Sequence, residues 1–91
     1  MRVLIVDDSS VMRKIVSRGL RQAGFKIDDI LEAGDGQQAM NILAKDTNFG
    51  LILSDWNMPV MDGLNLVKSV RASTGAAKTI PIVMVTTEGG E

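Results

Sequence analysis

The regular alternation of short apolar runs with longer amphipathic stretches constrains this chain more than any other feature. A short continuous apolar run, bounded by acidic or turn residues, predicts a buried strand of a parallel sheet. Apolar residues that recur at helical spacing predict helices between such strands. Strands are predicted at residues 3–6, 27–33, 51–55 and 80–85, and helices from residues 8–10 to Gly24, at 37–45 and at 63–73.

This order of elements specifies an α/β fold, a doubly wound parallel sheet with helices on both of its faces. The run 27–33 is partly polar, which fits a strand at the edge of the sheet. The sequence contains no internal repeat, and its 91 residues suffice for one small domain. A single domain spanning residues 1–91 is therefore predicted.

Polar side chains stand where three of the predicted strands end. Asp7 and Asp8 follow the first strand, Asp55 ends the third, and Thr86 follows the fourth. The carboxyl ends of parallel strands meet at one rim, where open α/β sheets bind their ligands. If the first and third strands are neighbours, the three carboxylates converge there.

Converging carboxylates repel one another, and a divalent cation would relieve that repulsion. A few hard oxygen ligands suit Mg2+ better than they suit Ca2+. The chain has neither cysteine nor histidine, so zinc, disulfides and thiol nucleophiles are not expected. A carboxylate beside a metal can act as a nucleophile and form an aspartyl-phosphate, and the Thr86 hydroxyl could then bind a phosphoryl oxygen.

Each of these residues also has an ordinary structural explanation. Asp8 could cap the first helix, Asp55 could form a turn with Asn57 and Pro59, and Thr86 could be a strand-end threonine. Their occurrence together, at the ends of three strands, favours a functional site over three separate coincidences.

Composition excludes several classes of partner. The formal charge of −1 and the single tryptophan give no reason to expect nucleic acid or an anionic membrane surface as a partner. No apolar stretch approaches the ~20 residues of a membrane span, so a cytoplasmic protein is expected. The basic residues of the first helix are interpreted as a solvated face, with a partner-docking surface as the alternative. They are Arg13, Lys14, Arg18 and Arg21.

Four stretches resemble the receiver domain of two-component response regulators, most closely the single-domain chemotaxis type with its CheY-like, flavodoxin-like fold. They are residues 3–9, 33–36, 54–63 and 81–86, in the order of that family. The most specific is SDWNMPVMDG at residues 54–63. The resemblance implies a phosphorelay receiver in which Asp55 accepts a phosphoryl group from a histidine kinase. Asp7, Asp8 and Asp55, with the backbone carbonyl of Asn57, would hold Mg2+.

The resemblance also implies how the signal would be switched and passed on. Thr86 would be the switch hydroxyl, and Asn57 and Glu88 would flank the phosphoryl group and tune self-dephosphorylation. Phosphorylation would favour a conformation that already exists at low occupancy. A downstream protein, such as the flagellar motor switch in chemotaxis, would read that conformation. Such a protein is not a turnover enzyme, because it catalyses only its own Mg2+-assisted phosphorylation and dephosphorylation.

The sequence departs from the family at its end. Receiver domains have five β/α units, whereas this chain stops after its fourth strand, so it is interpreted as an incomplete domain truncated there. The fourth helix, fifth strand and fifth helix are absent, together with a lysine that would reach the phosphoryl group. The strand from Ile80 to Val85 would then be a bare edge, and part of the first helix's apolar stripe would be exposed. A homo-oligomer formed through this strand is therefore expected.

Two other functions remain open. The first is a receiver fragment that keeps the fold but no longer signals, which would bind metal without being phosphorylated. The second is a Mg2+-dependent aspartyl-phosphate phosphohydrolase. That class carries Asp-x-Asp at the nucleophile strand, whereas Asp55 is followed here by Trp56 and Asn57.

Overall fold

The structure, a computed structural model, describes residues 1–73 and 75–85. These residues form a four-stranded parallel sheet in the order β2-β1-β3-β4. The strands are β1 (Arg2–Val6), β2 (Asp29–Ala33), β3 (Leu51–Asp55) and β4 (Ile82–Val85). The helices are α1 (Ser10–Gln22), α2 (Gly36–Lys45), α3 (Gly63–Ala72) and the 3-10 helix η1 (Ala76–Thr79).

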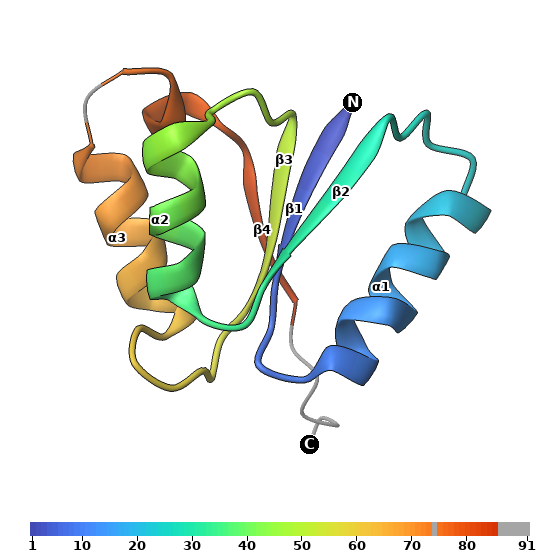
Figure 1. The fold of residues 1–91 in the computed structure, drawn as a ribbon, viewed down its shortest axis with the longest axis horizontal. Helices are drawn as coiled ribbons and strands as arrows, with labels where there is room; N and C mark the ends of the chain where they lie inside the picture. The colour runs from blue at the N-terminus through green and yellow to red at the C-terminus, as the bar shows by residue number, and fades with distance from the viewer. Residues whose placement is uncertain (74, 86–91) are drawn as a thin grey trace.

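The helices lie on both faces of the sheet, with α1 on one face and α2 and α3 on the other (Figure 1). The strand order reverses between β1 and β3, as in the flavodoxin-like sheets of flavodoxin and CheY. The predicted doubly wound parallel sheet, ending after a fourth strand, is thus confirmed. The placement of β2 at an edge is confirmed as well.

Alternate residues of the central strands pack into two separate cores. Leu4 and Ile52 point to the α2 and α3 side, where they are fully buried against Leu66 and Val70. On the α1 side the buried residues are Val3, Ile5 and Leu53, and they contact the half-buried Val16 and Leu20. The larger core therefore holds β1 and β3 from the side of α2 and α3.

Helix α1 is held less firmly than the others. None of its 13 residues, all of which the structure describes, is buried, whereas α2 buries the side chains of Ala39 and Leu43 and α3 buries those of Leu66 and Val70. Val11 and Ile15 are 63% and 53% exposed, so part of the predicted apolar stripe faces solvent. Val83, on the edge strand β4, is 48% exposed. This agrees with the expectation that the first helix and the fourth strand lack full cover.

Side-chain caps begin each of the longer helices. The Ser9 Oγ accepts a hydrogen bond from the Met12 N–H at 3.2 Å, so Ser9 is the cap among the candidates at residues 8–10. The carboxylates of Asp35 and Asp62 accept from the N–H groups of Gln38 and Asn65, at 2.8 and 2.9 Å. Caps of this kind satisfy free amides of the first helical turn.

No helix is predicted between residues 73 and 80, and the structure differs there. Residues Ala76–Thr79 form η1, in which Ala77 is buried and its carbonyl accepts from the Ile80 N–H at 3.2 Å. Strand β4 begins at Ile82 rather than Ile80, because Ile80 completes η1 and Pro81 has no N–H to donate.

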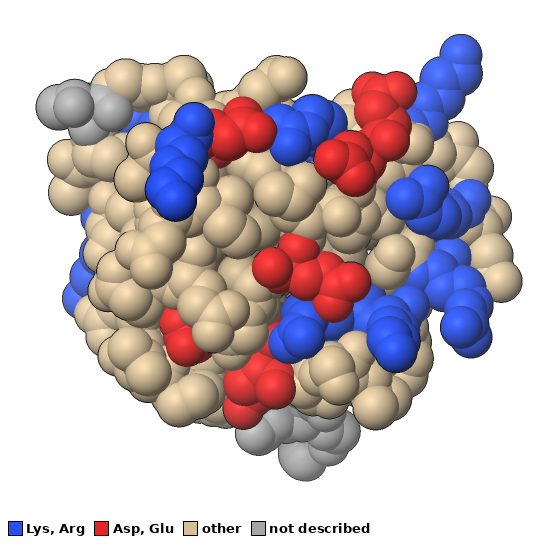
Figure 2. Space-filling view, in the orientation of Figure 1, with Lys and Arg blue, Asp and Glu red and all other residues tan. Residues whose placement is uncertain are grey.

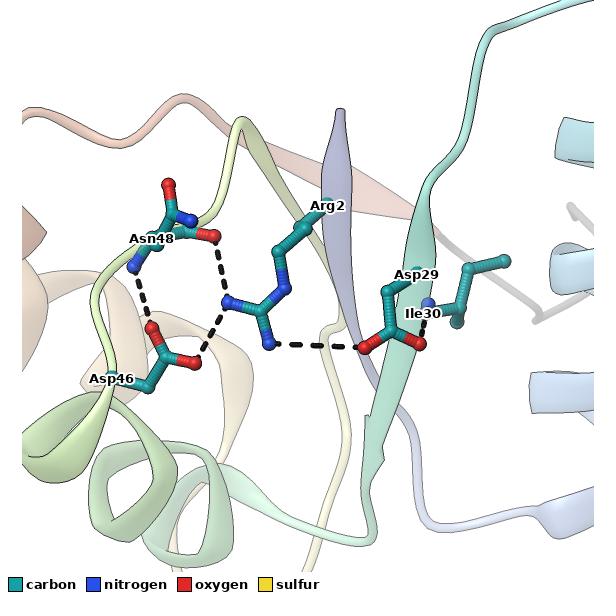
Figure 3. Close-up of polar contacts among 5 residues, drawn as sticks. All are labelled: Arg2, Asp29, Ile30, Asp46 and Asn48. Atoms are coloured by element: carbon teal, nitrogen blue, oxygen red, sulfur yellow. Dashed lines mark hydrogen bonds and ion pairs between the residues drawn. The ribbon is translucent and has the colours of Figure 1, made fainter.

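Arg2, the first residue of β1, joins three parts of the chain at the end of the sheet where β1 begins (Figure 3). Its Nη1 donates to Asp46 Oδ2 at 2.7 Å and to the Asn48 carbonyl at 3.0 Å. Its Nη2 lies 3.9 Å from Asp29 Oδ2, and its guanidinium stacks 4.7 Å from the centre of the Phe49 ring. These contacts tie β1 to β2 and to the loop that leads into β3.

Candidate functional site

Three carboxylates converge where β1 and β3 end. The strands are neighbours, and Val6 pairs with Ser54, so Asp7 and Asp55 follow at the same level of the sheet. Oxygens of Asp7, Asp8 and Asp55 all lie within 4.8 Å of one another. Asp7 and Asp55 are only 5% and 6% exposed, whereas Asp8 faces solvent. Figure 2 shows acidic side chains at the lower edge of the molecule, near the point where these strands end in Figure 1.

Asp7 is fixed by hydrogen bonds at three points. Its N–H donates to the Ala33 carbonyl at 3.0 Å, which continues the pairing of β1 with β2. Its own carbonyl accepts from Arg13 Nη1 at 2.7 Å. Its carboxylate Oδ1 accepts from the Ser9 N–H at 2.9 Å. The backbone and the side chain of Asp7 are therefore both held in place.

Burial raises the pKa of the Asp7 carboxyl above its usual value of 3.8, since desolvation disfavours the charged form. The hydrogen bond from the Ser9 N–H opposes this rise, and the nearby charges of Asp55 and Asp8 add to it. Within the described residues, no ion pair neutralises the negative charge of this site. A cation bound there would favour the ionised form of Asp7.

Asp55 is held by the chain on both sides of it. Its Oδ1 accepts from the Trp56 N–H at 2.8 Å, and its carbonyl accepts from Ser54 Oγ at 3.0 Å. Helix α3 starts directly behind it, because the Gly63 N–H donates to the Trp56 carbonyl at 2.9 Å. A side chain at Gly63 has no room, since an ideal β-carbon would stand 2.2 Å from the Asp55 carbonyl oxygen.

The loop between β3 and α3 contains a strained turn. The Met61 N–H donates to the Pro59 carbonyl at 2.6 Å, and Val60 between them has φ 66°. A β-branched residue rarely adopts this left-handed conformation. The Met61 carbonyl accepts from the Gly36 N–H at 2.9 Å, so the turn is pinned to the start of α2. The loop beside Asp55 is therefore bonded near its start, where the Trp56 carbonyl accepts from Gly63, and near its end, where the Met61 carbonyl accepts from Gly36.

The residues present fit a hard divalent cation. The candidate ligands are carboxylate oxygens, which are the ligand type that Mg2+ takes in proteins. Within residues 1–73 and 75–85, no lysine or arginine forms an ion pair with Asp7, Asp8 or Asp55. Asn57 is exposed in the loop after Asp55. Thr86 and Glu88, the other predicted site residues, lie outside the described residues.

Sequence reasoning missed the part that Arg13 plays. Its side chain was predicted to belong to a solvated basic face, but it is only 19% exposed and contacts Asp7 and Glu32. Lys14, Arg18 and Arg21 are exposed as predicted, and basic side chains gather over α1 in Figure 2. A signal was available: a long side chain early in a helix points back toward the helix start, which here is the end of β1.

The fold and the acidic rim between β1 and β3 define a receiver-type α/β domain. Residues 3–91 match the family described as the response regulator receiver domain, and the chain belongs to that family. A chemotaxis protein CheY homolog of Campylobacter jejuni is 48% identical over 91 residues, which cover all of this chain and 68% of that protein. Chemotaxis protein CheY1 of Helicobacter pylori is 47% identical over 91 residues, 71% of its length.

Solved structures of response regulators also resemble this chain. The chemotaxis response regulator CheY4 of Vibrio cholerae superposes with a TM-score of 0.79 at 43% identity, over 98% of this chain and 70% of that one. The bacteriophytochrome response regulator AtBRR has a TM-score of 0.83 at 23% identity, which shows the fold alone. This chain is therefore the receiver domain of a CheY-like response regulator of two-component signalling. In the described part of the chain, no helix is long and apolar enough to cross a membrane.

Proposed function

We propose that this receiver domain accepts a phosphoryl group on Asp55 from a histidine kinase, with Mg2+ held by Asp7, Asp8 and Asp55. The observation that carries the proposal is the convergence of three carboxylates, with oxygens within 4.8 Å of one another. The backbone carbonyl of Asn57 would complete the protein ligands. Mg2+ supplies the positive charge that lets an anionic carboxylate approach an anionic phosphoryl group.

The nucleophile is an Asp55 carboxylate oxygen. Because Oδ1 accepts the Trp56 N–H, we assign the attack to Oδ2. Its bond to phosphorus forms as the bond between phosphorus and the donor histidine nitrogen breaks, and that nitrogen keeps the electron pair. Asp7 and Asp8 bind rather than react. Burial of Asp55 at 6% exposure limits the access of water to the new acyl phosphate.

We propose the remaining roles by resemblance to the family. Thr86 is the switch hydroxyl, and Asn57 and Glu88 flank the phosphoryl group and tune its hydrolysis. The phosphorylated domain signals by a population shift rather than by turnover, so it is not a turnover enzyme. Its partners are a histidine kinase and a downstream protein in the cytoplasm. The chemotaxis names of its relatives support a motility output such as the flagellar motor switch.

Trp56 allows a direct test, because it neighbours Asp55 and is 45% exposed. Mg2+ is titrated first, and the small phosphodonor acetyl phosphate is added afterwards, while Trp56 fluorescence is followed. Intact mass reports whether one phosphoryl group is added. We expect a saturable Mg2+ response and a further reversible change that Asp55→Asn lacks. The absence of both from the unaltered protein would overturn the proposal.

Two alternatives give different results in the same experiment. Sustained hydrolysis of a generic phosphate monoester would favour the phosphohydrolase. A Mg2+ response without any gain in mass would favour the non-signalling fragment. Neither alternative has a specific structural observation behind it, whereas the three carboxylates suit a receiver.

We further propose that the 91-residue chain self-associates through β4. This edge strand reads Ile82-Val83-Met84-Val85 and carries no charge, whereas the opposite edge strand, β2, is protected by Asp29 and Glu32. An uncharged apolar edge is a template for pairing with another chain. A second copy offers the same edge to it.

Light scattering on the chain at micromolar concentration tests this self-association. Val83→Lys should produce monomers. Leu64→Lys on α3 is the matched control, since Leu64 is 49% exposed and Val83 is 48% exposed, and it should leave the oligomer intact. A compact folded monomer of the unaltered chain would contradict the proposal.

A further inference from the structure

Arg13 links the end of β1 to the edge strand β2. Its Nη1 donates to the Asp7 carbonyl at 2.7 Å, and its Nε donates to Glu32 Oε1 at 2.7 Å. The side chain is only 19% exposed, although it belongs to a helix without a buried residue among the 13 described. The guanidinium therefore sits between two strands rather than in solvent.

We propose that Arg13 is a positioning residue for the carboxylate site, acting through the backbone of Asp7 and held in place by Glu32. The inference rests on the proposed function, because it concerns the same Mg2+ ligands. Asp7 is tied to Ala33 through its N–H and to Arg13 through its carbonyl. Together these two bonds fix the peptide units on either side of the Asp7 α-carbon. The direction of the Asp7 side chain follows from them.

The geometry requires a guanidinium. Two donors of one rigid planar group point to two acceptors, one directly after β1 and one on β2, and both bonds are short and charge-assisted. A lysine has the same charge but a single nitrogen on a flexible stem, so it cannot hold both acceptors at once in this way. Glu32 is the partner that keeps the guanidinium from swinging toward solvent. Its side chain is 40% exposed, so it can be changed with little effect on packing.

The charge of Arg13 and its positioning role predict opposite effects of a substitution on Mg2+ affinity. A positive charge beside three carboxylates repels a cation, so removing charge alone should tighten Mg2+ binding slightly. Loss of the fixed position of Asp7 should weaken Mg2+ binding. Outer-shell partners of metal ligands typically change metal affinity by roughly tenfold or more. A variant that keeps the positive charge but loses the paired hydrogen bonds of the guanidinium separates the two effects.

The first measurement is the Mg2+ dissociation constant, followed by Trp56 fluorescence at fixed ionic strength. Arg13→Lys should weaken binding by roughly tenfold. The matched control is Lys14→Ala, which removes a charge from the neighbouring exposed position and should bind as well as the unaltered protein or slightly better. Unchanged affinity in Arg13→Lys, with a lower urea midpoint, would show that Arg13 only anchors the helix and would overturn the inference.

A second measurement needs no metal and separates this inference from the proposed function. Amide hydrogen exchange at Asp7 and Ser9 reports two hydrogen bonds: the one from the Asp7 N–H to the Ala33 carbonyl, and the one from the Ser9 N–H to the Asp7 carboxylate. In Arg13→Lys these amides should exchange roughly tenfold faster, since a lost charged hydrogen bond has that size of effect. The amide of Leu66 in α3, which donates to the carbonyl of the N-cap residue Asp62, is the reference and should not change. Unaltered exchange at Asp7 and Ser9 would overturn the inference whether or not the protein binds Mg2+.

Discussion

The backbone carbonyl of Asp55 occupies the space that a side chain on Gly63 would need. An ideal β-carbon at Gly63 would stand 2.2 Å from that oxygen and 2.5 Å from the Cε of Met84. Glycine at the first position of α3 therefore lets the helix start directly against the strand end that carries Asp55, the proposed phosphoacceptor. The position of the site depends on this close approach of backbone to backbone.

Gly63→Ala should lower the free energy of unfolding by about 2 kcal/mol, because overpacking against backbone outweighs the ~1 kcal/mol that alanine contributes in a helix. It should also weaken the Trp56 response to Mg2+. Gly19→Ala in α1 is the control, since nothing lies within 4 Å of its added β-carbon, and it should stabilise by up to ~1 kcal/mol. Urea unfolding measures both variants. Equal stability of Gly63→Ala and the unaltered protein would show that the helix shifts without penalty.

Much of this arrangement could be predicted from the sequence, and the reason is periodicity. The continuous apolar runs before Asp7 and Asp55 indicate buried parallel strands, and parallel strands bring their carboxyl ends to one rim. The adjacency of β1 and β3 then places both carboxylates together. This reasoning needs no knowledge of side-chain direction, which explains why it succeeded.

Other features could not be read from patterns because tertiary contacts decide them. The hydrophobic pattern makes Arg13 look like any exposed residue on a helical wheel, and only its place early in α1 hints at the contact with the Asp7 carbonyl. Val60 gives no sign of a left-handed backbone, since valine disfavours one. The helix η1 has only four residues, and its one buried member, Ala77, gives too weak a periodic signal.

Val60→Asn should stabilise the domain by about 1 kcal/mol, because asparagine tolerates the φ of 66° that strains a β-branched residue. The side chain is 82% exposed, so little packing is lost. Val11→Asn is the control. Val11 is 63% exposed in a helix, where valine and asparagine have similar propensities, so its stability should hardly change. A fall in the urea midpoint of Val60→Asn would argue against strain in this turn.

Arg2→Lys should destabilise the domain by about 1–2 kcal/mol while leaving Mg2+ affinity unchanged. Lysine keeps the charge but loses the paired contacts with Asp46 and Asn48 and the stacking on Phe49. Arg2 is the first residue of β1, at the opposite end of the strand from Asp7. Arg2→Lys should therefore change urea unfolding but not the Mg2+ titration, whereas Arg13→Lys should change the Mg2+ titration. Exposed Arg18→Lys is the control and should alter neither measurement.

The stability of the metal-free domain should depend on pH through Asp7 in an unusual direction. Burial raises the pKa of this carboxyl in the folded state above its unfolded value of 3.8. The stability that the protonated Asp7 carboxyl contributes is therefore complete below pH 3.8, and it is lost as the pH rises through the folded pKa. Asp7→Asn keeps an acceptor for the Ser9 N–H and removes the charge. It should unfold at higher urea than the unaltered protein at neutral pH, and the difference should shrink as the pH falls toward 3.8.

Asp28 provides a control of opposite sign for this pH dependence. The amino group of Met1 donates a hydrogen bond to its carboxylate and lowers the pKa of Asp28 below 3.8. Its contribution is present above pH 3.8 and is lost as the pH falls through the folded pKa. Asp28→Asn should therefore be less stable than the unaltered protein at neutral pH, and the two should converge in acid. If Asp7→Asn and Asp28→Asn changed stability in the same direction at neutral pH, burial of the Asp7 charge would not be the cause.

Added Mg2+ should remove the stability advantage of Asp7→Asn at neutral pH, because the unaltered site gains a cation that the variant binds less well.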